Sequence, residues 1–287
     1  MSATVYVNGR ITNERDAVVS VFDHGFLYGE GVYETLRTYR RQLFLFDRHA
    51  RRLRRSASLI ALDVHFTDAD LLQAITATME QAMLAGEAYV RVLLTRGVGD
   101  LTYDPKATPS HTLVIIVKPH VDPPESAYRD GVAVAIVDIV RNHPGSVNPV
   151  IKSNNLMNNA LAMQEALRRG AFEGVMRNYL GELTECTTAN LFVVNNGSVL
   201  TPPLSAGILP GITREFMFEI GRAMGVDVRE AVLHDEDLYG ADEAFLTSTT
   251  REAVPIVAVD GRSIGEGKPG PVTLKLLEEF RRAAKSG

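Results

Sequence analysis

The sequence contains a single cysteine, Cys186, among its 287 residues. One cysteine cannot form an intramolecular disulfide, and it cannot supply a cysteine-based zinc site. This scarcity fits a reducing compartment. Because a chain of this length can bury a sizeable core without cross-links or metal, we expect an ordinary globular protein of one or two domains.

Long apolar runs and a signal-like start are also lacking. No apolar run approaches the roughly 20 residues that a bilayer-spanning helix needs, and the N-terminus lacks the basic-then-apolar layout of a signal peptide. The chain carries 30 basic and 35 acidic residues, a net charge of −5, which gives no general attraction to nucleic acid or to anionic membranes. We therefore expect a soluble, cytoplasmic protein that binds neither nucleic acid nor membrane.

Several familiar catalytic motifs are absent as well. The histidines are dispersed without an HExxH motif, and the chain has no GxGxxG, GxSxG or GxxxxGK[ST] sequence. We expect no metal site. The arginine-rich run Arg48–Arg55 invites a nucleic-acid interpretation, but its arginines scatter around the helical wheel of an acidic chain. A solvated helix face with one or two arginines turned inward is the better interpretation.

The sequence does contain a mixture of strand and helix patterns, without the regular alternation of a doubly wound sheet. Residues 17–22 and residues 132–140 predict strands. Thr67 and Asp70 predict a capping box at the start of a helix, and Asn196-Gly197 predicts a tight turn.

The segment Lys118–Gly131 is rich in proline and charge, so it is the best candidate for a linker. We therefore expect a mixed α/β fold of two domains with a cleft between them. The expected division is a smaller N-terminal α/β domain over residues 1–118, an interdomain linker over residues 119–131, and a larger C-terminal domain over residues 132–287.

Lys152 is the first candidate for catalysis. It follows the apolar residues Val150 and Ile151 and precedes a polar, asparagine-rich helix start. A lysine in such a setting suits a cleft, where desolvation favours the neutral amine that attacks an aldehyde. The alternative is an ordinary solvated surface lysine.

Glu185 and two hydroxyl-rich turns are further candidates. Glu185 precedes the apolar strand 191–194, where its carboxylate can hold a ring nitrogen in the protonated form; the alternative is an exposed strand glutamate. The segment Leu209–Glu215 places Pro210-Gly211 before a helix, whose first N–H groups and Thr213 hydroxyl form a natural phosphate cradle, although many helices begin in this way without a ligand. The turn Thr247–Thr250 offers more donors.

Six segments, in order along the chain, resemble those of the fold-type IV (class IV) pyridoxal-phosphate enzymes. That family includes branched-chain aminotransferases, D-amino acid aminotransferases and aminodeoxychorismate lyases. The segments are DHGFLYGEGVYETLR, HARRL, IKSNN, LTECTTANLF, LPGITR and FLTSTT. The resemblance runs nearly end to end. It implies the two-domain α/β architecture of the family, a C-terminal domain that binds pyridoxal 5'-phosphate, the cofactor in the interdomain cleft, and a homodimer or higher homo-oligomer.

The resemblance also implies roles for individual residues. Lys152 forms the Schiff base with the cofactor and acts as general acid and base, and Glu185 contacts the pyridine nitrogen. The expected phosphate contacts are Arg52, Ile212, Thr213, Ser248 and Thr249. The expected substrate contacts are Tyr28, Tyr33, Arg37, Tyr89, Arg91 and Thr250.

The substrate class follows from the same resemblance. The substrate-contact positions and the loop RGVGDLTYDP are most similar to branched-chain aminotransferases, whereas Leu156 and Met157 stand where those enzymes place a tyrosine, and Thr35 stands where they place a glycine. The leading hypothesis is transfer of the amino group between a branched-chain L-amino acid and 2-oxoglutarate. The alternatives are a transaminase for D-amino acids or (R)-amines, a lyase that releases pyruvate from aminodeoxychorismate, and a non-enzymatic binding protein. Lys152 together with Glu185 argues against the last of these.

Overall fold

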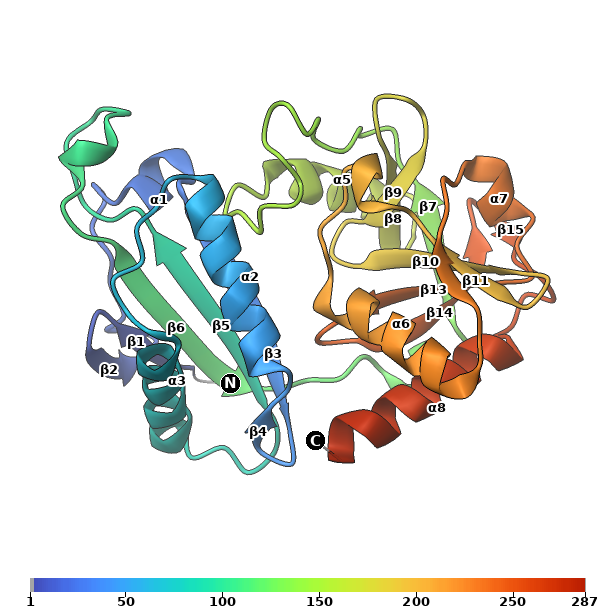
Figure 1. Ribbon diagram of the computed structural model, residues 1–287, viewed down its shortest axis with the longest axis horizontal. Helices are drawn as coiled ribbons and strands as arrows, with labels where there is room; N and C mark the ends of the chain where they lie inside the picture. The colour runs from blue at the N-terminus through green and yellow to red at the C-terminus, as the bar shows by residue number, and fades with distance from the viewer. Residues whose placement is uncertain (1–2, 287) are drawn as a thin grey trace. The chain divides into compact units, whose positions relative to one another are not determined.

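The protein is described by a computed structural model that covers residues 3–286 and divides into two compact units (Figure 1). The first unit comprises residues 3–121 together with the short segment Ile151–Asn155, and the second comprises Asp122–Val150 and residues 156–286. Lys152 therefore belongs to the first unit. This differs from the division expected from the sequence, in which residue 152 lay in the C-terminal domain.

The first unit is an antiparallel sheet with helices packed on it. The sheet has six strands in the order β2-β1-β6-β5-β3-β4, and α2 and α3 contact its strands. Its elements are β1 Thr4–Val7, β2 Arg10–Asn13, α1 His24–Tyr28, β3 Gly31–Tyr39, β4 Gln42–Leu43, α2 Phe46–Leu59, α3 Asp68–Ala82, β5 Ala88–Thr95, η1 Pro105–Ala107 and β6 Thr112–Pro119.

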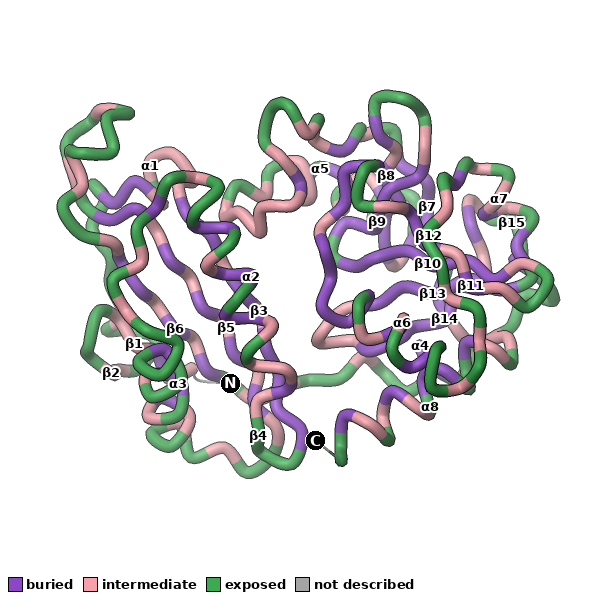
Figure 2. Tube along the Cα trace, viewed as in Figure 1, coloured by how far each residue is buried: buried purple, intermediate pink, exposed green. Residues whose placement is uncertain are grey.

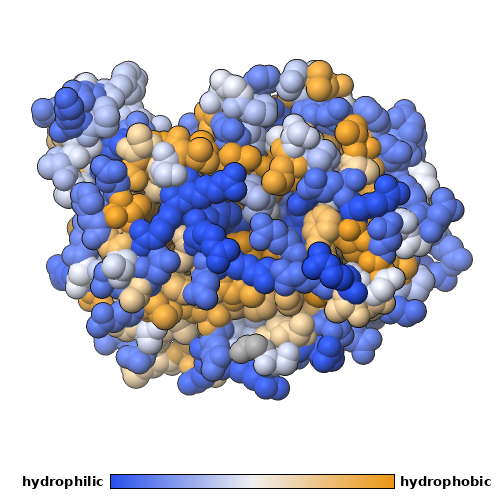
Figure 3. Space-filling view, in the orientation of Figure 1, coloured by the Kyte–Doolittle hydropathy of each residue, from blue (hydrophilic) through white to orange (hydrophobic). Residues whose placement is uncertain are grey.

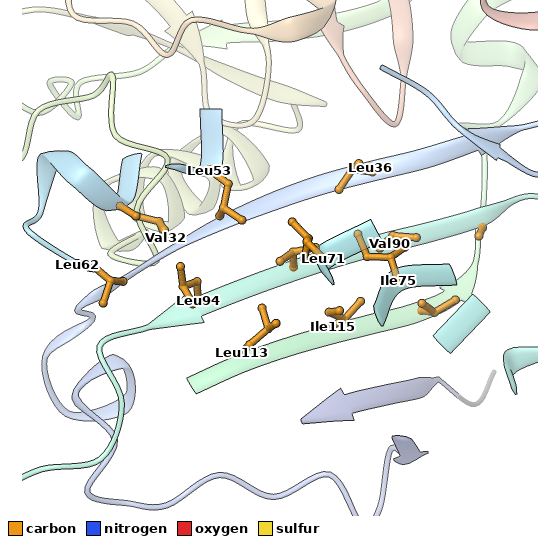
Figure 4. Packing of buried hydrophobic residues seen from close by; sticks show 14 residues of the cluster. Val32, Leu36, Leu53, Leu62, Leu71, Ile75, Val90, Leu94, Leu113 and Ile115 are labelled. Carbon is orange, nitrogen blue, oxygen red and sulfur yellow. The ribbon is translucent and has the colours of Figure 1, made fainter. Parts of the chain in front are cut away.

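Alternation along β5 explains how this sheet has two different faces. Val90, Val92 and Leu94 are buried, whereas the residues between them are half-buried. Figure 4 shows the labelled core side chains, including Leu53 and Ile75, packed together between the strands and the helices. Each fully buried Leu or Ile contributes about 1.5–3 kcal/mol. The other face of β3 and β5 is left for polar and aromatic side chains.

Local patterns correctly predicted features of two helices of this unit, α2 and α3. Thr67 and Asp70 form the expected capping box at the start of α3. In α2, Arg52 is buried while Arg51 and Arg55 are exposed, and Figure 3 shows strongly hydrophilic side chains gathered over this helix. The interpretation of the arginine run as a solvated face with an inward arginine is therefore confirmed.

The predicted strand over residues 17–22 is wrong. Val18 and Val21 are 75% and 63% exposed, and the segment has no regular structure. An apolar, β-branched sequence becomes a strand only when a neighbour supplies its hydrogen bonds, and the sheet order places no strand beside this segment. The chain is instead anchored at its end, where Gly99 N donates to Phe22 O.

The second unit is built on a nine-stranded sheet. The main path runs β12-β11-β10-β13-β14-β7-β8-β9, and β15 pairs with β14. Its elements are α4 Glu125–Arg129, β7 Val132–Ile136, α5 Met157–Arg168, β8 Glu173–Arg177, β9 Leu183–Cys186, β10 Asn190–Asn195, β11 Ser198–Thr201, η2 Leu204–Ala206, α6 Ile212–Met224, β12 Val228–Glu230, α7 Asp235–Tyr239, β13 Glu243–Ser248, β14 Glu252–Val259, β15 Arg262–Ser263 and α8 Pro271–Ser286.

One additional pairing closes this sheet on itself. Glu185 in β9 pairs with Asn190 in β10, so that β10, β13, β14, β7, β8 and β9 form a closed ring. Figure 2 shows buried residues concentrated along strands such as β10 and β13. The strands of the ring therefore carry many of the buried residues of the unit, and the ring closes at Glu185, a residue that the sequence had singled out.

One expectation for the second unit was inaccurate. β7 ends at Ile136 rather than at residue 140, because β14 stops at Val259, turns back into β15, and leaves residues 137–140 without a neighbour on that side. The boundary between the two units, at Val121 and Asp122, falls within the segment 119–131 expected as a linker, and the later part of that segment forms α4, which buries Ala127 and Tyr128. The Asn196-Gly197 turn between β10 and β11 is confirmed, with φ of 50° and 78°.

Within residues 3–286 no helix is long and apolar enough to cross a membrane. The same residues contain no cluster of three or more His, Cys, Asp or Glu side chains suited to a metal ion.

Candidate active site

The backbone of the Lys152 segment is fixed to β3 and α2. Tyr33 N donates to Lys152 O at 2.9 Å, and Lys152 N donates to Ser56 Oγ at 3.1 Å. Two residues further on, Asn154 N donates to Gly31 O at 2.9 Å. These bonds explain why the segment belongs to the first unit, and they hold the lysine at the start of β3.

Three of the predicted site residues meet at one aromatic ring. Lys152 Nζ lies 4.5 Å from the centre of the Tyr33 ring, and Arg91 Cζ lies 4.1 Å from the same centre. A cation near an aromatic face gains about 0.5–2 kcal/mol, depending on its exposure to water. Tyr33 therefore restrains both cations and sets their positions relative to each other.

Arg52, the expected phosphate arginine, belongs to a buried charge cluster that the sequence did not reveal. Its Nε and Nη2 donate to the two Glu34 oxygens at 2.7 and 2.8 Å, and His49 Nδ1 lies 2.6 Å from Glu34 Oε2. Burial alone raises the pKa of Glu34, but Arg52 and His49 hold that pKa well below its usual range. Burial lowers the pKa of His49. Glu34 is therefore an anion that fixes the Arg52 guanidinium.

A signal for this cluster was present in the sequence. An arginine on the apolar side of an amphipathic helix needs a buried acidic partner, and Glu34 lies in the neighbouring strand motif. Sequence reasoning did not connect the two because 18 residues separate them.

Glu185 is buried and holds four hydrogen-bond donors. Its Oε1 accepts from Arg141 Nε and Nη2 at 3.0 and 2.9 Å, and its Oε2 accepts from Asn190 Nδ2 and Leu209 N at 3.2 and 3.1 Å. Arg141 is itself held by Asn158, whose Oδ1 accepts from Nη1 at 3.2 Å. Charged donors of this kind stabilise the ionised carboxylate. Arg141 was not predicted from the sequence.

The first predicted phosphate cradle has the features of an anion site. α6 begins after Gly211 without a side-chain cap from the described residues, so its first N–H groups are available to a ligand. Thr213 is buried, and its Oγ1 finds no hydrogen-bond partner within residues 3–286. Ile212 is buried beside it. A buried hydroxyl without a partner and an uncapped helix start both fit a bound phosphate.

Asn190 connects this cradle to Glu185. Besides bonding to Glu185, its Nδ2 donates to Leu209 O at 3.0 Å, and a Cβ atom at Gly211 would overlap with its Oδ1. Only glycine fits there. Asn190 also pairs with Thr247, the first residue of the second hydroxyl-rich turn. The second unit thus brings Glu185, the α6 start and that turn to one place.

The second turn follows β13. Ser248 Oγ accepts from Arg251 Nε at 3.2 Å, and Arg251 N donates to Ser248 O at 3.2 Å. Thr249 and Thr250 are half-buried at its tip. The turn is therefore fixed at both ends while its tip keeps partial access to solvent.

The remaining predicted substrate residues lie in the first unit. Register pairs Thr35 with Arg91 and Arg37 with Tyr89, so Arg37, Tyr89 and Arg91 share one sheet face with Tyr33. Arg37 lies over Tyr39 at 4.3 Å. Tyr89 lies beside Lys118, at 4.9 Å from its Nζ.

Three further positions named from the sequence do not belong to these strands. Tyr28, at the end of α1, lies 5.0 Å from the ring of Tyr103. In the second unit, Met157 is 66% exposed and Leu156 is half-buried.

Several known proteins have sequences similar to this one. A putative branched-chain-amino-acid aminotransferase of Methanocaldococcus jannaschii is 38% identical over 277 residues, covering 96% of this chain and 95% of that protein. A D-alanine aminotransferase of Bacillus licheniformis is 32% identical, covering 94% of this chain and 93% of that protein.

Solved structures agree. The branched-chain amino acid aminotransferase of Escherichia coli superposes with a TM-score of 0.95 at 30% identity, covering 100% of this chain and 96% of that chain. The branched-chain aminotransferase of Thermoproteus uzoniensis, solved with norvaline, gives a TM-score of 0.93 at 32% identity, covering 100% and 96% of the two chains. The expected fold class, the aminotransferase activity and the pyridoxal 5'-phosphate cofactor are confirmed. The family model for amino-transferase class IV matches residues 31–259, and this chain belongs to that family.

Proposed function

We propose that this protein transfers amino groups between branched-chain L-amino acids and 2-oxoglutarate, with Lys152 carrying the cofactor. The observation that carries the proposal is the position of Arg91. It lies against Tyr33, which also contacts Lys152, and within residues 3–286 it has no ion pair with a carboxylate. An unpaired cation beside an aromatic wall suits a pocket that accepts an apolar side chain in one half-reaction and a carboxylate in the other.

The energetics of the acceptor support this role for Arg91. A distal carboxylate placed in a wholly apolar pocket would be desolvated without a partner, which is costly. A charged hydrogen bond is worth about 1.5–3 kcal/mol. Arg91 can supply that bond, whereas the Tyr33 ring supplies apolar surface for a branched side chain.

The roles of the other residues follow from their contacts. Pyridoxal phosphate, when bound, supplies an aromatic ring that accepts the electron pair left by removal of the substrate α-proton. The Lys152 amine moves that proton. Glu185, whose carboxylate accepts from Arg141 and Leu209, would place a negative charge beside the ring nitrogen.

The phosphate would be held by charge and by directed donors. The proposed donors are the N–H groups of Ile212 and Thr213 at the start of α6 and the unpaired Thr213 hydroxyl. The side chains of Ser248, Thr249 and Arg52 complete the set. Several charge-assisted bonds to a dianion fix the ring while the amino partner changes.

We also propose that the protein acts as a homodimer, in the cytoplasm. Two segments of the first unit, joined where Asp23 pairs with Val98, expose an unusual number of large apolar side chains. Exposed apolar groups of this kind mark protein–protein contacts. The free thiol of Cys186 is buried, as suits a reducing compartment. The exposed apolar residues are Val18, Val19, Val21, Phe22, Phe26, Val98, Leu101 and Tyr103.

A second candidate is transamination of D-amino acids or (R)-amines. The absence of a tyrosine at positions 156 and 157 favours it, since Leu156 is half-buried and Met157 is exposed, so neither offers a hydroxyl. The likeness to a D-alanine aminotransferase points the same way. The non-enzymatic alternative is not retained, because the chain belongs to an aminotransferase family.

One substrate panel distinguishes these functions. L-leucine, L-valine, D-alanine and (R)-1-phenylethylamine are each assayed with 2-oxoglutarate and with pyruvate, and aminodeoxychorismate is tested alone for pyruvate release. We expect the highest kcat/KM for the branched-chain L-amino acids with 2-oxoglutarate. A higher value for D-alanine or the (R)-amine would support the second candidate, and pyruvate release without an acceptor would indicate a lyase.

A further inference from the structure

Three parts of the second unit meet at the guanidinium of Arg251. Its Nη1 lies 2.8 Å from Glu173 Oε1 in β8, and its Nε donates to Ser248 Oγ at 3.2 Å. Its Nη2 donates to Thr188 O at 3.2 Å and also contacts the Thr188 hydroxyl. The residue therefore ties the Ser248–Thr250 turn to the turn that follows Glu185.

Glu173 explains why a cation is needed at this point. Its side chain is completely buried, and it accepts from the hydroxyls of Thr187 and Thr188 in addition to Arg251. A buried carboxylate without a charged partner is strongly destabilising. Arg251 is 17% exposed, so the pair is largely shielded from water and its geometry is correspondingly well defined.

The contact with Arg251 determines which way the Ser248 hydroxyl can act. A guanidinium only donates, so Ser248 Oγ accepts the Arg251 Nε–H. The single Ser248 proton must then be directed away from Arg251. Within the described residues Ser248 Oγ is recorded only as an acceptor, so its proton is available to an external anion.

We propose that Arg251 is a positioning residue: it commits the Ser248 hydroxyl to donate to the cofactor phosphate and fixes the Ser248–Thr250 turn against the Thr187–Asn190 turn. This inference rests on the proposed function, because it takes the phosphate of pyridoxal phosphate as the anion. In this proposed role Arg251 and Glu173 act through Ser248 and do not touch the cofactor.

The test compares two cofactor analogues that differ only in the phosphate. Equilibrium dissociation constants for pyridoxal phosphate and for pyridoxal are measured on the apoprotein from the absorbance of the lysine-bound form. Arg251→Met should weaken pyridoxal phosphate binding roughly 3- to 10-fold, the value of one ordinary hydrogen bond, while pyridoxal binding is unchanged. A merely structural role would not change the ratio of the two constants.

A matched control is Arg281, whose partner Glu252 is the residue that follows Arg251. Arg281 pairs with the buried Glu252 at 2.6 Å, and it has no recorded contact with Ser248 or Thr188. Arg281→Met should lower the melting temperature without changing the ratio of the two dissociation constants. It therefore separates loss of an ion pair from loss of the orienting contact.

Two further variants keep the inference testable if Arg251→Met does not fold. Arg251→Lys keeps a cation for Glu173 but cannot reach Ser248 and Thr188 at once, and Arg251→Met combined with Glu173→Gln removes the unpaired charge. Both should recover melting temperature and keep the altered ratio. If both fold and retain the wild-type ratio, the inference is overturned. A wild-type protein that forms no adduct at Lys152 would instead contradict the proposed function itself, and this inference with it.

Discussion

Replacing Arg52 with alanine should change two properties of the protein that can be measured separately. The first is cofactor affinity. Loss of one charged hydrogen bond to the phosphate, worth about 1.5–3 kcal/mol, should weaken pyridoxal phosphate binding about 10- to 150-fold. The second is the stability of the apoprotein, because Arg52 is also the charged partner of Glu34.

The structure indicates that the stability effect is the larger one. Glu34 is 1% exposed, and alanine at position 52 would leave this carboxylate with His49 as its only recorded neighbour in the cluster. Breaking a buried ion pair by removing one partner costs about 3–5 kcal/mol. With about 2–4 °C per kcal/mol for a protein of this size class, the melting temperature of the apoprotein should fall by about 6–20 °C.

A double variant separates the two effects. Arg52→Ala combined with Glu34→Gln removes the unpaired charge, so the melting temperature should recover in large part while cofactor affinity stays low. Thermal unfolding of the apoprotein and titration with pyridoxal phosphate measure the two quantities independently. Arg51→Ala is the matched control, since Arg51 is the exposed neighbour of Arg52 on α2.

Two results would refute this reasoning. Equal losses of affinity in Arg51→Ala and Arg52→Ala would mean that Arg52 is not the phosphate arginine. An Arg52→Ala apoprotein as stable as the wild type would mean that Glu34 does not depend on its ion pair.

The remaining predictions concern other parts of the site. Lys152→Ala should lose the absorbance band of the lysine-bound cofactor and nearly all turnover; borohydride reduction that labels a different lysine would contradict the assignment. Glu185→Gln should still bind the cofactor while turnover falls by orders of magnitude, and wild-type turnover would remove its proposed role at the ring nitrogen. Arg91→Met should lower kcat/KM for 2-oxoglutarate roughly 10-fold or more, from loss of one charged hydrogen bond, with far less effect on 4-methyl-2-oxopentanoate; a uniform loss would indicate a structural role. Because burial lowers the pKa of His49 below its ordinary value of 6.5, the unfolded chain takes up this proton at higher pH than the folded one. The free energy of unfolding should therefore decrease as the pH falls below about 6.5, and His49→Gln should make that decrease shallower in urea titrations at pH 7 and pH 5.

Features that depend on a few neighbouring residues were predictable from the sequence. The capping box of Thr67 and Asp70 and the Asn196-Gly197 turn are set by local hydrogen bonds and by local φ preferences. The two strands misjudged at residues 17–22 and 137–140 failed for the opposite reason. Both sequences favour a strand, but a strand also needs a partner elsewhere in the chain.

The same contrast between local and distant interactions applies to the residues of the candidate site. Lys152 and Glu185 were found because each lies in a contiguous motif. Arg141, the partner of Glu185, was missed because it lies 44 residues earlier in the chain, and Arg251 was missed because it lies 63 residues after its partner Thr188. Ion pairs of this separation are properties of the packed fold, and one sequence without a structure carries no local signal for them.

The closed ring of the second unit has a consequence for how the protein is made. β7 at Val132–Ile136 pairs in parallel with β14 at Glu252–Val259, so the ring cannot close until the ribosome has synthesised residue 259. Until then β7 and β10 each present an unpaired edge, which is a template for association with other chains. Non-local parallel pairing is also slow to form. Until β13 and β14 are present to cover these edges, the nascent second unit is open to association with other chains.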